Sequence, residues 1–408
     1  MDKNYFDFLV IGGGAAGVFS AITYKKKHPD QSVILVEKSA VLLSKVKVSG
    51  GGRCNVTHAC FDPGLLCKNY PRGNKELRGP FHHFQPKDTI DWFESRGVKL
   101  KTEADGRMFP ITDQSETIIR CLLSEADQLG VVIQTRQKIL NLLKKDNHFS
   151  LEIEKKEPLF AGKVVLATGS NPDGYKWAQQ LGHTIEPPVP SLFTFNVPTS
   201  NLKHLSGIAL SHVEIAINES KLIQKGALLI THFGFSGPAI LKLSAWGARY
   251  LHEKQYRVPF YINWVPEYTE EKMTSILLDT KKNSPQKILF SENPFILPKN
   301  LWRFFLEAIS PEPSQKKWCD FSLKEIRALT TKIHRDVYLL EGKTTHKEEF
   351  VTCGGICLKE VNFKTMESKI CPHLFFAGEI LDIDGVTGGF NFQNAWTTAA
   401  IIANHDLS

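Results

Sequence analysis

A glycine-rich turn near the start of the chain has the residue types and spacing that bind a dinucleotide. It follows the apolar run Asp7–Ile11 and precedes a helical pattern, which is the context that a GxGxxG match requires. The first glycine permits a tight turn, the second lets a pyrophosphate approach the backbone, and the third lets the helix pack on the strand. The N-terminus of the helix attracts phosphate. The turn consists of Gly12, Gly13, Gly14, Ala15, Ala16 and Gly17.

An acidic residue completes this fingerprint at the end of the next apolar run. Glu37 stands twenty positions after Gly17 and directly after Val33–Val36. At that position a carboxylate accepts hydrogen bonds from the two hydroxyls of an adenosine ribose, and it repels the ribose phosphate of NADP. The predicted cofactor site therefore includes Glu37 and its neighbour Lys38.

A second glycine-rich segment favours FAD over NAD. A simple dehydrogenase completes its second nucleotide half soon after the first, whereas this chain continues with a long loop over Ser44–Tyr70. Three consecutive glycines flanked by polar side chains form a flexible backbone with donors, suited to wrapping phosphate and flavin edges. The predicted contacts in this loop are Lys45, Ser49, Gly50, Gly51, Gly52, Arg53, Cys54 and Asn55.

Two later segments also favour a flavin. One is a buried run ending in Ala167, Thr168 and Gly169, which can pass close to the dinucleotide. The other ends in Glu379, an acid placed to bond a ribityl hydroxyl, and it continues through a double glycine into an apolar helix. Free N–H groups at that helix start would stabilise negative charge on a reduced flavin ring. The predicted contacts there are Gly389, Phe390 and Asn391.

Two residues are candidates for catalysis. His232 lies in a Gly/Pro-rich loop and has a side chain suited to proton transfer. Arg53 can steady an anionic intermediate or a substrate carboxylate, and it can equally bind a phosphate. Cys54 and Cys60 form an alternative redox pair, but five residues separate them, whereas disulfide reductases use four. The eight cysteines show no CxxC pair and no zinc spacing, so we expect reduced thiols and no metal.

The elements that position these residues change in kind along the chain. Alternating strand and helix patterns in the first 190 residues predict βαβ units and a parallel sheet. The predicted strands are Phe6–Ile11, Ser32–Val36, Val131–Gln134 and Lys163–Leu166. The predicted helices are Ala15–Lys27, Lys87–Arg96, Ser115–Leu129 and Tyr175–Leu181. A cluster of prolines, Pro187, Pro188 and Pro190, is expected to end regular structure there.

The pattern in the middle of the chain predicts a segment inserted into the FAD-binding domain. Short alternating runs from Ser191 to Pro266 predict antiparallel strands, and Leu and Ile at helical spacing from Thr269 to Val337 predict helices. We expect an α/β fold: a discontinuous Rossmann-like FAD-binding domain, an inserted, barrel-like antiparallel β domain and a small helical domain. The predicted bounds are 1–190 with 350–408, 191–266 with 336–349, and 267–335, respectively.

Composition narrows the partners. The 408 residues carry a net charge of +7, which is mild and interspersed, so it disfavours a nucleic-acid partner and suits small anionic ligands. The most apolar opening stretch, Phe6–Ile22, lacks a basic leading region, and no run reaches the roughly 20 apolar residues of a membrane span. We therefore expect a cytoplasmic protein with no membrane partner. The sequence leaves the oligomeric state open.

Five segments carry a family resemblance: VIGGGAAG, KVSGGGRCNVTH, THFGFSGPAIL, KTMESK and LFFAGEILDIDGVTGGFNFQNAWTTA. They resemble the BaiN/YhiN-like bacterial flavoprotein family of NAD(P)/FAD-dependent oxidoreductases, which includes FAD-binding enzymes named aminoacetone oxidases and bile-acid enone reductases. The resemblance runs from Phe6 to about Ile402. One departure is a shorter loop after Gly169, where the family pattern has a longer Gly/Ser/Pro-rich stretch before its Asp-Gly-Tyr.

The resemblance implies FAD bound by a Rossmann-like domain, with an inserted β domain and a small helical domain. Carried over by motif, it places FAD on Gly12–Gly17, Glu37, Lys45, Ser49–Asn55, the backbone near Ile139, Glu379 and Gly389–Asn391.

The predicted function is an FAD-dependent oxidoreductase that moves hydride between flavin and a small organic substrate of the amine, hydroxy or enone type. No second GxGxxG follows a strand elsewhere, so any NAD(P)H reductant is expected to dock transiently. Three alternatives stay open: a flavoprotein that acts on RNA, one that acts on a thiol or disulfide, and a non-catalytic FAD-binding protein.

Overall fold

The computed structural model describes residues 4–198, 201–218, 220–344 and 351–403. Residues 345–350, where the sequence predicts a domain boundary, lie outside the described residues. The chain divides into two compact units. The first unit comprises Met1–Ser191 and His346–Ser408, and the second comprises Leu192–Thr345.

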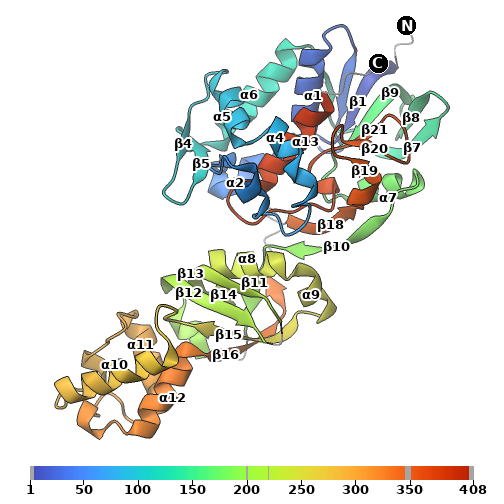
Figure 1. Ribbon diagram of the computed structural model, residues 1–408. Coiled ribbons are helices and arrows are strands. Elements are labelled where there is room, and N and C mark those ends of the chain that lie inside the picture. The colour runs from blue at the N-terminus through green and yellow to red at the C-terminus, as the bar shows by residue number, and fades with distance from the viewer. Residues whose placement is uncertain (1–3, 199–200, 219, 345–350, 404–408) are drawn as a thin grey trace. The chain divides into compact units, whose positions relative to one another are not determined.

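The first unit is built on a nine-stranded sheet whose central strands are parallel (Figure 1). Its main order is β19-β20-β21-β9-β1-β2-β6, and β7 and β8 extend it as an antiparallel hairpin beside β9. Strands β21, β9, β1, β2 and β6 run parallel, with Val10 opposite both Leu35 and Val165. The strands are β1 Tyr5–Ile11, β2 Val33–Val36, β6 Val132–Gln134, β7 Ile139–Lys145, β8 His148–Ile153, β9 Leu159–Leu166, β19 Val361–Asn362, β20 Glu367–Ser368 and β21 Leu374–Phe376.

Helices α1 (Ala15–Lys27) and α13 (Phe390–Ala403) pack closely against each other beside this sheet (Figure 1). Every described position of α13 except Asn391 and Phe392 is buried, because the helix lies inside the unit. Its buried polar side chains Gln393, Thr397 and Thr398 are hydrogen-bonded there. The remaining helices of the unit are α2 Ser44–Gly52, α3 Pro63–Cys67, α4 Pro80–His83, α5 Pro86–Glu94, α6 Ser115–Gln128 and α7 Pro172–Gln180, with 3₁₀ turns at Glu76–Arg78, Leu358–Glu360 and Gly378–Ile380.

Two smaller sheets complete the first unit. A three-stranded antiparallel sheet has the order β3-β5-β4, from Thr57–His58, Arg107–Pro110 and Leu100–Thr102. A two-stranded sheet joins β10 (Ile185–Ser191) to β18 (Val351–Ile356).

The proline cluster does not end regular structure, and that prediction is wrong. Pro187, Pro188 and Pro190 all lie within strand β10. Prolines lack the N–H that a ladder uses, so strands tolerate them at edges and bulges. Here the strand has a single partner, β18, and its register shifts between Glu186 and Val189, where two of the prolines stand.

The second unit has a seven-stranded antiparallel sheet in the order β16-β15-β12-β13-β14-β11-β17. Its strands are β11 Thr194–Asn196, β12 Ala209–Ile217, β13 Ile223–Thr231, β14 Gly234–Ser236, β15 Arg257–Asn263, β16 Asp336–Glu341 and β17 Lys343–Thr344. Its helices are α8 Pro238–Trp246, α9 Ala248–Glu253, α10 Glu270–Asn283, α11 Lys299–Ile309 and α12 Leu323–His334, with 3₁₀ turns at Asn201–Leu205, Leu289–Ser291 and Trp318–Asp320. Figure 1 shows α10, α11 and α12 gathered together beyond strands β15 and β16.

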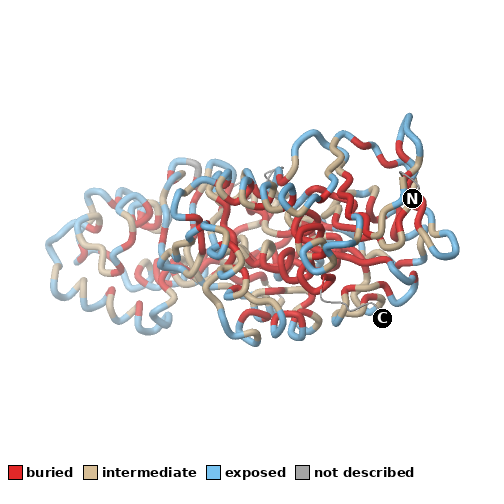
Figure 2. Tube along the Cα trace, turned by 90° about the horizontal axis from the view of Figure 1, so that it is seen from above, coloured by how far each residue is buried: buried red, intermediate tan, exposed pale blue. Residues whose placement is uncertain are grey.

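One hydrophobic cluster fills the second unit. It contains Phe195, Phe235 and Phe260 from the strands as well as Trp302 and Ile333 from the helices. Figure 2 shows how burial varies along the chain: buried residues lie on inner segments, and exposed residues lie on outer turns. The division of this unit into a β domain and a helical domain stays a prediction.

The observed elements agree closely with the helices and strands that periodicity predicts, and the Rossmann-like α/β fold class is confirmed. Helix α1 spans the predicted Ala15–Lys27. Among the described residues, no helix combines the length and the apolar character needed to cross a membrane.

Candidate functional site

The predicted cofactor residues of the first unit gather where parallel strands end. Successive strand ends are held side by side by backbone hydrogen bonds, from Ala167 N to Ile11 O at 2.9 Å and from Gly12 N to Val36 O at 2.9 Å. Ala377, the first residue after strand β21, donates its N–H to Leu166 O at the end of β9 at 3.2 Å. Ligands of open parallel sheets bind at this carboxyl edge. Four loops therefore meet there, after β1, β2, β9 and β21.

The glycines of the first turn differ in what surrounds them. Gly12 has φ +114°, and a Cβ there would lie 2.4 Å from the carbonyl oxygen of Ala167. A Cβ on Gly17 would lie 1.8 Å from the carbonyl oxygen of Gly12, so both positions require glycine for packing. A Cβ on Gly14 would meet nothing within 4 Å. Gly14 is also the N-cap of α1 and offers no side-chain cap, which leaves the first amides of that helix directed at open space.

Glu37, the first residue after strand β2, is hydrogen-bonded to the glycine turn that follows β1. Its Oε2 accepts a hydrogen bond from Gly13 N at 2.6 Å, and its Oε1 accepts one from Ser39 N at 2.7 Å. The backbone amides of Gly13 and Ser39 therefore orient the carboxylate. Each of its oxygens keeps a lone pair that can accept a further hydrogen bond from a ligand. Lys38 pairs with Asp173 at 2.9 Å, and both side chains are about half exposed.

The second glycine segment forms the end of helix α2 and the turn that follows. Gly50, Gly51 and Gly52 all have positive φ, between +58° and +84°. A Cβ on Gly51 or Gly52 would meet nothing within 4 Å, so this stretch also borders open space. Ser49 leaves the helical conformation, and its hydroxyl donates to Val46 O at 3.0 Å.

Side chains after this turn join it to the start of helix α13. With its amide oriented to match donors to acceptors, Asn55 accepts from Gly389 N at 2.9 Å and donates to Thr57 O at 3.0 Å. His58 Nδ1 lies 3.0 Å from Gly388 O, and its ring stacks on Phe390 with centroids 4.6 Å apart. The two segments that the sequence assigns to the flavin therefore lie side by side.

The turn into helix α13 is braced on its other side. Asn391 accepts from Gly385 N at 2.8 Å and donates to Gly385 O at 2.9 Å. The carbonyl of Phe390 accepts from the hydroxyl of Tyr70 at 2.7 Å. These bonds fix the double glycine in front of the helix. The first amides of the helix, from Phe390 onward, have no acceptor within the helix.

A polar group surrounds Glu379 at the end of β21. Its Oε2 pairs with Lys45 Nζ at 2.5 Å, and its Oε1 accepts from Thr352 N at 3.1 Å. A Cβ on Gly169 would lie 3.4 Å from the same carboxylate. Three buried hydroxyl oxygens, those of Thr168, Tyr175 and Thr352, have no hydrogen-bond partner among the described residues.

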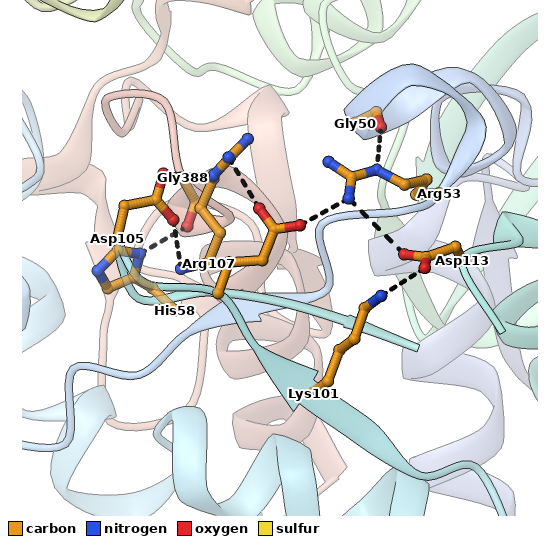
Figure 3. Close-up of polar contacts among 9 residues, drawn as sticks. Gly50, Arg53, His58, Lys101, Asp105, Arg107, Asp113 and Gly388 are labelled. Atoms are coloured by element: carbon orange, nitrogen blue, oxygen red, sulfur yellow. Dashed lines mark hydrogen bonds and ion pairs between the residues drawn. The ribbon is translucent and has the colours of Figure 1, made fainter. Parts of the chain in front are cut away.

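Arg53 lies in a network of charged side chains (Figure 3). Its guanidinium pairs with Glu103 at 2.6 Å and with Asp113 at 3.7 Å, and Lys101 also pairs with Asp113. The side chain lies 4.0 Å from the ring centroid of Phe109, and its Nε donates to Gly50 O. The hydrogen bond to Glu103 raises the pKa of Arg53, and the hydrogen bond from Lys101 lowers the pKa of Asp113. Figure 3 shows this network continuing through Arg107 and Asp105 beside His58.

The thiols of this region, Cys54 and Cys60, are not joined in a disulfide. Cys54 is fully buried with φ +63°, and burial raises its pKa to about 12. Burial also raises the pKa of Cys60. All eight cysteines are free thiols, and no three His, Cys, Asp or Glu residues in the described ranges are arranged to hold a metal ion.

Two predicted residues remain. The segment before Ile139 adjoins the loop of Glu37, because Gln137 N donates to Glu37 O at 2.9 Å. Ile139 begins strand β7, is buried and pairs with Ile153 of β8. His232 belongs to the second unit, where it stands exposed in the short turn between β13 and β14 beside Phe233, whose side chain is 69% exposed.

The charged network beside Arg53 was missed by reasoning from the sequence, although a signal exists. Charged residues occupy every second position from Lys101 on β4 to Arg107 on β5, with Glu103 and Asp105 in the turn between the two strands. His58 is also part of the GRCNVTH segment, but nothing in its spacing identifies its contact with Gly388.

Comparison with known proteins identifies the family. The model of the HI0933-like protein Rossmann domain matches residues 6–405. The chain belongs to the HI0933-like Rossmann family. This membership covers nearly the whole chain and confirms the resemblance seen in the sequence, together with the expectation of an FAD-dependent oxidoreductase.

Two curated relatives and one solved structure illustrate the range of this family and fold. A ribosomal RNA dihydrouridine synthase of Escherichia coli is 30% identical over 97% of this chain and 96% of its own length. A 3-dehydro-bile acid delta(4,6)-reductase of Clostridium scindens is 26% identical over 95% of this chain and 96% of its own. The structure of 3-ketosteroid delta1-dehydrogenase from Sterolibacterium denitrificans matches with a TM-score of 0.53 at 10% identity, covering 99% of each chain, which concerns the fold alone.

Proposed function

We propose that this protein reduces the C5=C6 double bond of uridine in ribosomal RNA, with FAD as its resident cofactor. The observation that carries this proposal is the full-length similarity, at 30% identity, to a ribosomal RNA dihydrouridine synthase. The alternative of an RNA substrate, which the sequence left open, is thereby preferred to a free small molecule. A cytoplasmic location suits this substrate.

The residues present fit FAD. The open space at Gly14, Gly51 and Gly52 leaves room for a pyrophosphate and a ring edge. The uncapped start of α1 offers amides to the pyrophosphate, and Glu37 offers a carboxylate to the ribose. The hydroxyls of Thr168 and Thr352 lie buried without a partner near Glu379, which suits the hydroxyls of a ribityl chain. Bound FAD would accept electrons from NADH or NADPH and return them to the substrate as hydride.

The names of the two relatives indicate substrates with one feature in common, a carbon–carbon double bond conjugated to a carbonyl group. In uracil the C5=C6 bond is conjugated to the carbonyl at C4, and a 3-oxo group conjugated to double bonds at 4 and 6 is the corresponding steroid case. Addition of hydride to the far carbon of such a bond leaves negative charge on the carbonyl oxygen. The balanced reaction is uridine plus NAD(P)H and one proton to dihydrouridine plus NAD(P)⁺.

The chain offers groups for that negative charge. Arg53 is held in place by Glu103 and Phe109 beside Gly50, and its guanidinium carries more donors than these contacts use. The amides that begin α13 lie on the adjoining segment. We assign charge stabilisation to Arg53 and to these amides. The catalytic role that the sequence suggests for His232 stays a prediction.

A free enone is the second candidate substrate, favoured by the relative from Clostridium scindens. The test compares both classes on the FAD-loaded protein under anaerobic conditions. Protein reduced with NADPH or NADH is mixed with unmodified ribosomal RNA, with a 3-oxo-4-ene steroid, or with buffer. We expect rapid flavin reoxidation and dihydrouridine, detected by mass spectrometry, with RNA. Reoxidation by the steroid alone would transfer the assignment to the second candidate.

A thiol or disulfide substrate is the weaker alternative. It requires a thiolate beside the flavin, and Cys54 is buried with a pKa of about 12. A non-catalytic FAD-binding protein would show no reoxidation with any substrate in the same experiment.

A further inference from the structure

The positive charge of the chain is concentrated in the second unit. Residues 192–345 contain 20 Lys and Arg against 14 Asp and Glu, a net charge of +6. The first unit contains 30 against 29, a net charge of +1. The overall value of +7 is therefore not spread along the molecule as the sequence pattern suggested. A unit of 154 residues with this excess attracts a polyanion more strongly than the whole chain's average implies.

This unit has a groove of about 930 Å³ between its sheet and its helices. The walls come from the turn Asn201–Leu205, from helix α11, from the end of helix α12 and from strand β16. The lining residues with polar or charged side chains are Asn201, His204, Asn300, Arg303, Glu307, Lys332 and Tyr338. Glu307 is the acidic residue among the described residues that line it.

The basic side chains of the groove differ in their surroundings. Arg303 and His204 are exposed. Lys332 pairs at 2.5 Å with Asp336, whose side chain is fully buried while that of Lys332 is 31% exposed. The buried carboxylate also accepts from Trp264 Nε1 at 3.0 Å, so the strand below the groove holds Asp336 in place under the ammonium group.

The groove also offers flat apolar surface and amide donors. Phe304 is half-buried on the same face of α11 as Arg303, and Val337 is 54% exposed on β16. Asn201 and Asn300 supply side-chain amides. Cations for phosphates, aromatic or guanidinium planes for bases and amides for base edges are the chemistry that binds single-stranded RNA.

We propose that this groove is an RNA-binding site that holds a single-stranded segment of the substrate RNA. The proposal rests on the proposed function for the identity of the polyanion, and it assigns the second unit the role of binding RNA. Arg303 is the residue whose positive charge is most available to a phosphate. No ion pair to it is found among the described residues, and its guanidinium lies over the ring of Phe290, 5.3 Å from the centroid.

The test measures binding directly and needs no turnover. The probe is a fluorescein-labelled single-stranded RNA of about 16 nucleotides, the upper site size of one compact binding module. Its fluorescence anisotropy is followed with the full-length, FAD-loaded protein between 50 and 200 mM KCl. The variants are Arg303→Glu and the milder Arg303→Gln. The matched control is Lys254→Glu, an equal charge reversal at an exposed residue after α9, outside the groove.

We expect Arg303→Glu to raise the Kd for RNA roughly tenfold and Arg303→Gln to reduce the slope of log Kd against log salt by about 0.7, the value for one phosphate contact on a single strand. Lys254→Glu should change the Kd less than about twofold. Equal weakening of RNA binding by Arg303→Glu and Lys254→Glu, or unchanged RNA binding in both Arg303 variants, would contradict the proposal that the groove binds RNA. Wild-type protein that fails to bind the RNA at 50 mM KCl would overturn it as well.

Dihydrouridine formation separates this proposal from the proposed function. If the wild type binds RNA through Arg303 but forms no dihydrouridine, the groove stands and the proposed function fails. If dihydrouridine forms with the same KM in wild type and in Arg303→Gln, the proposed function stands and the groove fails. FAD content, measured by absorbance, should be equal in all variants. Near-UV circular dichroism, which reports the buried Trp264, Trp302 and Trp318 of the second unit, confirms that this unit is folded in each.

Discussion

The guanidinium of Arg53 lies 2.6 Å from the carboxylate of Glu103, on a hairpin that comes from a different part of the sequence. This contact holds Arg53 over Phe109 and next to the glycine turn. It makes Glu103 a positioning residue for a group that we assign to charge stabilisation.

Removing the Arg53 guanidinium should slow hydride transfer more than it weakens substrate binding. Arg53→Ala removes charged hydrogen bonds worth about 1.5 to 3 kcal/mol, so the anaerobic rate of flavin reoxidation should fall by roughly 10- to 100-fold. Glu103→Gln should lower the same rate by a smaller factor and Arg53→Lys should restore part of it. The matched control, Asp105→Asn, disturbs only the bond to Arg107 and should leave the rate unchanged. Equal effects of Glu103→Gln and Asp105→Asn would contradict the positioning role.

Valine at position 14 should exclude the cofactor without unfolding the protein. A Cβ at Gly14 meets no protein atom within 4 Å, so the branched side chain would occupy only the space assigned to the pyrophosphate. We expect FAD affinity to fall at least about tenfold, or 1.4 kcal/mol. Gly79→Val is the control, because Gly79 has φ −63° and an equally open Cβ position. Equal FAD affinity in wild type and Gly14→Val, measured by flavin fluorescence, would place the cofactor elsewhere.

Cys54 should behave as a packing thiol. With a pKa of about 12, raised by burial, roughly 10⁻⁴ of it is thiolate at pH 8, and the fraction grows only as pH rises toward 12. Iodoacetamide should therefore label the exposed Cys319 and leave Cys54 unlabelled in the native protein. Cys54→Ser should retain FAD and change turnover less than about tenfold, or 1.4 kcal/mol, and His232→Ala should be more damaging. A long-wavelength charge-transfer band that disappears in Cys54→Ser would reverse this order.

Glu325 should stabilise the second unit in a pH-dependent way. Burial alone would raise its pKa, but Lys316, Ser310 and the helix-capping Ser322 lower it from 4.5 to about 2. Because the folded-state pKa is depressed, the stabilisation is present above about pH 4.5 and is lost as pH falls toward 2.

The measurement for Glu325 is the free energy of unfolding of peptides spanning 322–334, obtained from hydrogen exchange against urea. The difference between wild type and Glu325→Gln should narrow by about 2 kcal/mol between pH 7 and pH 3. Glu267→Gln, at an exposed position, should show no such change. A difference that is the same at both pH values would show that Glu325 stabilises only through uncharged hydrogen bonds.

Much of the fold could be predicted because local pattern and tertiary structure agree. The period of apolar residues in α1 and in the strands β1, β2 and β9 is the period of the elements that form. The prolines of β10 misled the prediction, since composition alone does not reveal that the strand has one partner and a bulge.

The candidate cofactor site could be proposed from the sequence because its residues belong to contiguous motifs. The GxGxxG turn and Glu37 carry their own signal, and the open space at Gly14 matches the role predicted for it. The pairing of Arg53 with Glu103 joins positions fifty residues apart, and that of His58 with Gly388 joins positions 330 apart. Such contacts depend on how loops meet in three dimensions, which spacing along one sequence does not encode. The charge of the second unit likewise emerged only once its bounds were known.

The most direct test of the account is a single-turnover experiment with RNA. The FAD-loaded protein, reduced under anaerobic conditions, is mixed in excess with ribosomal RNA that lacks dihydrouridine, and flavin absorbance and the modified nucleoside are followed together. The account predicts that flavin reoxidises at the rate at which dihydrouridine appears, with one dihydrouridine formed per flavin oxidised. Flavin that stays reduced in the presence of the RNA, or reoxidises without forming dihydrouridine, would contradict it.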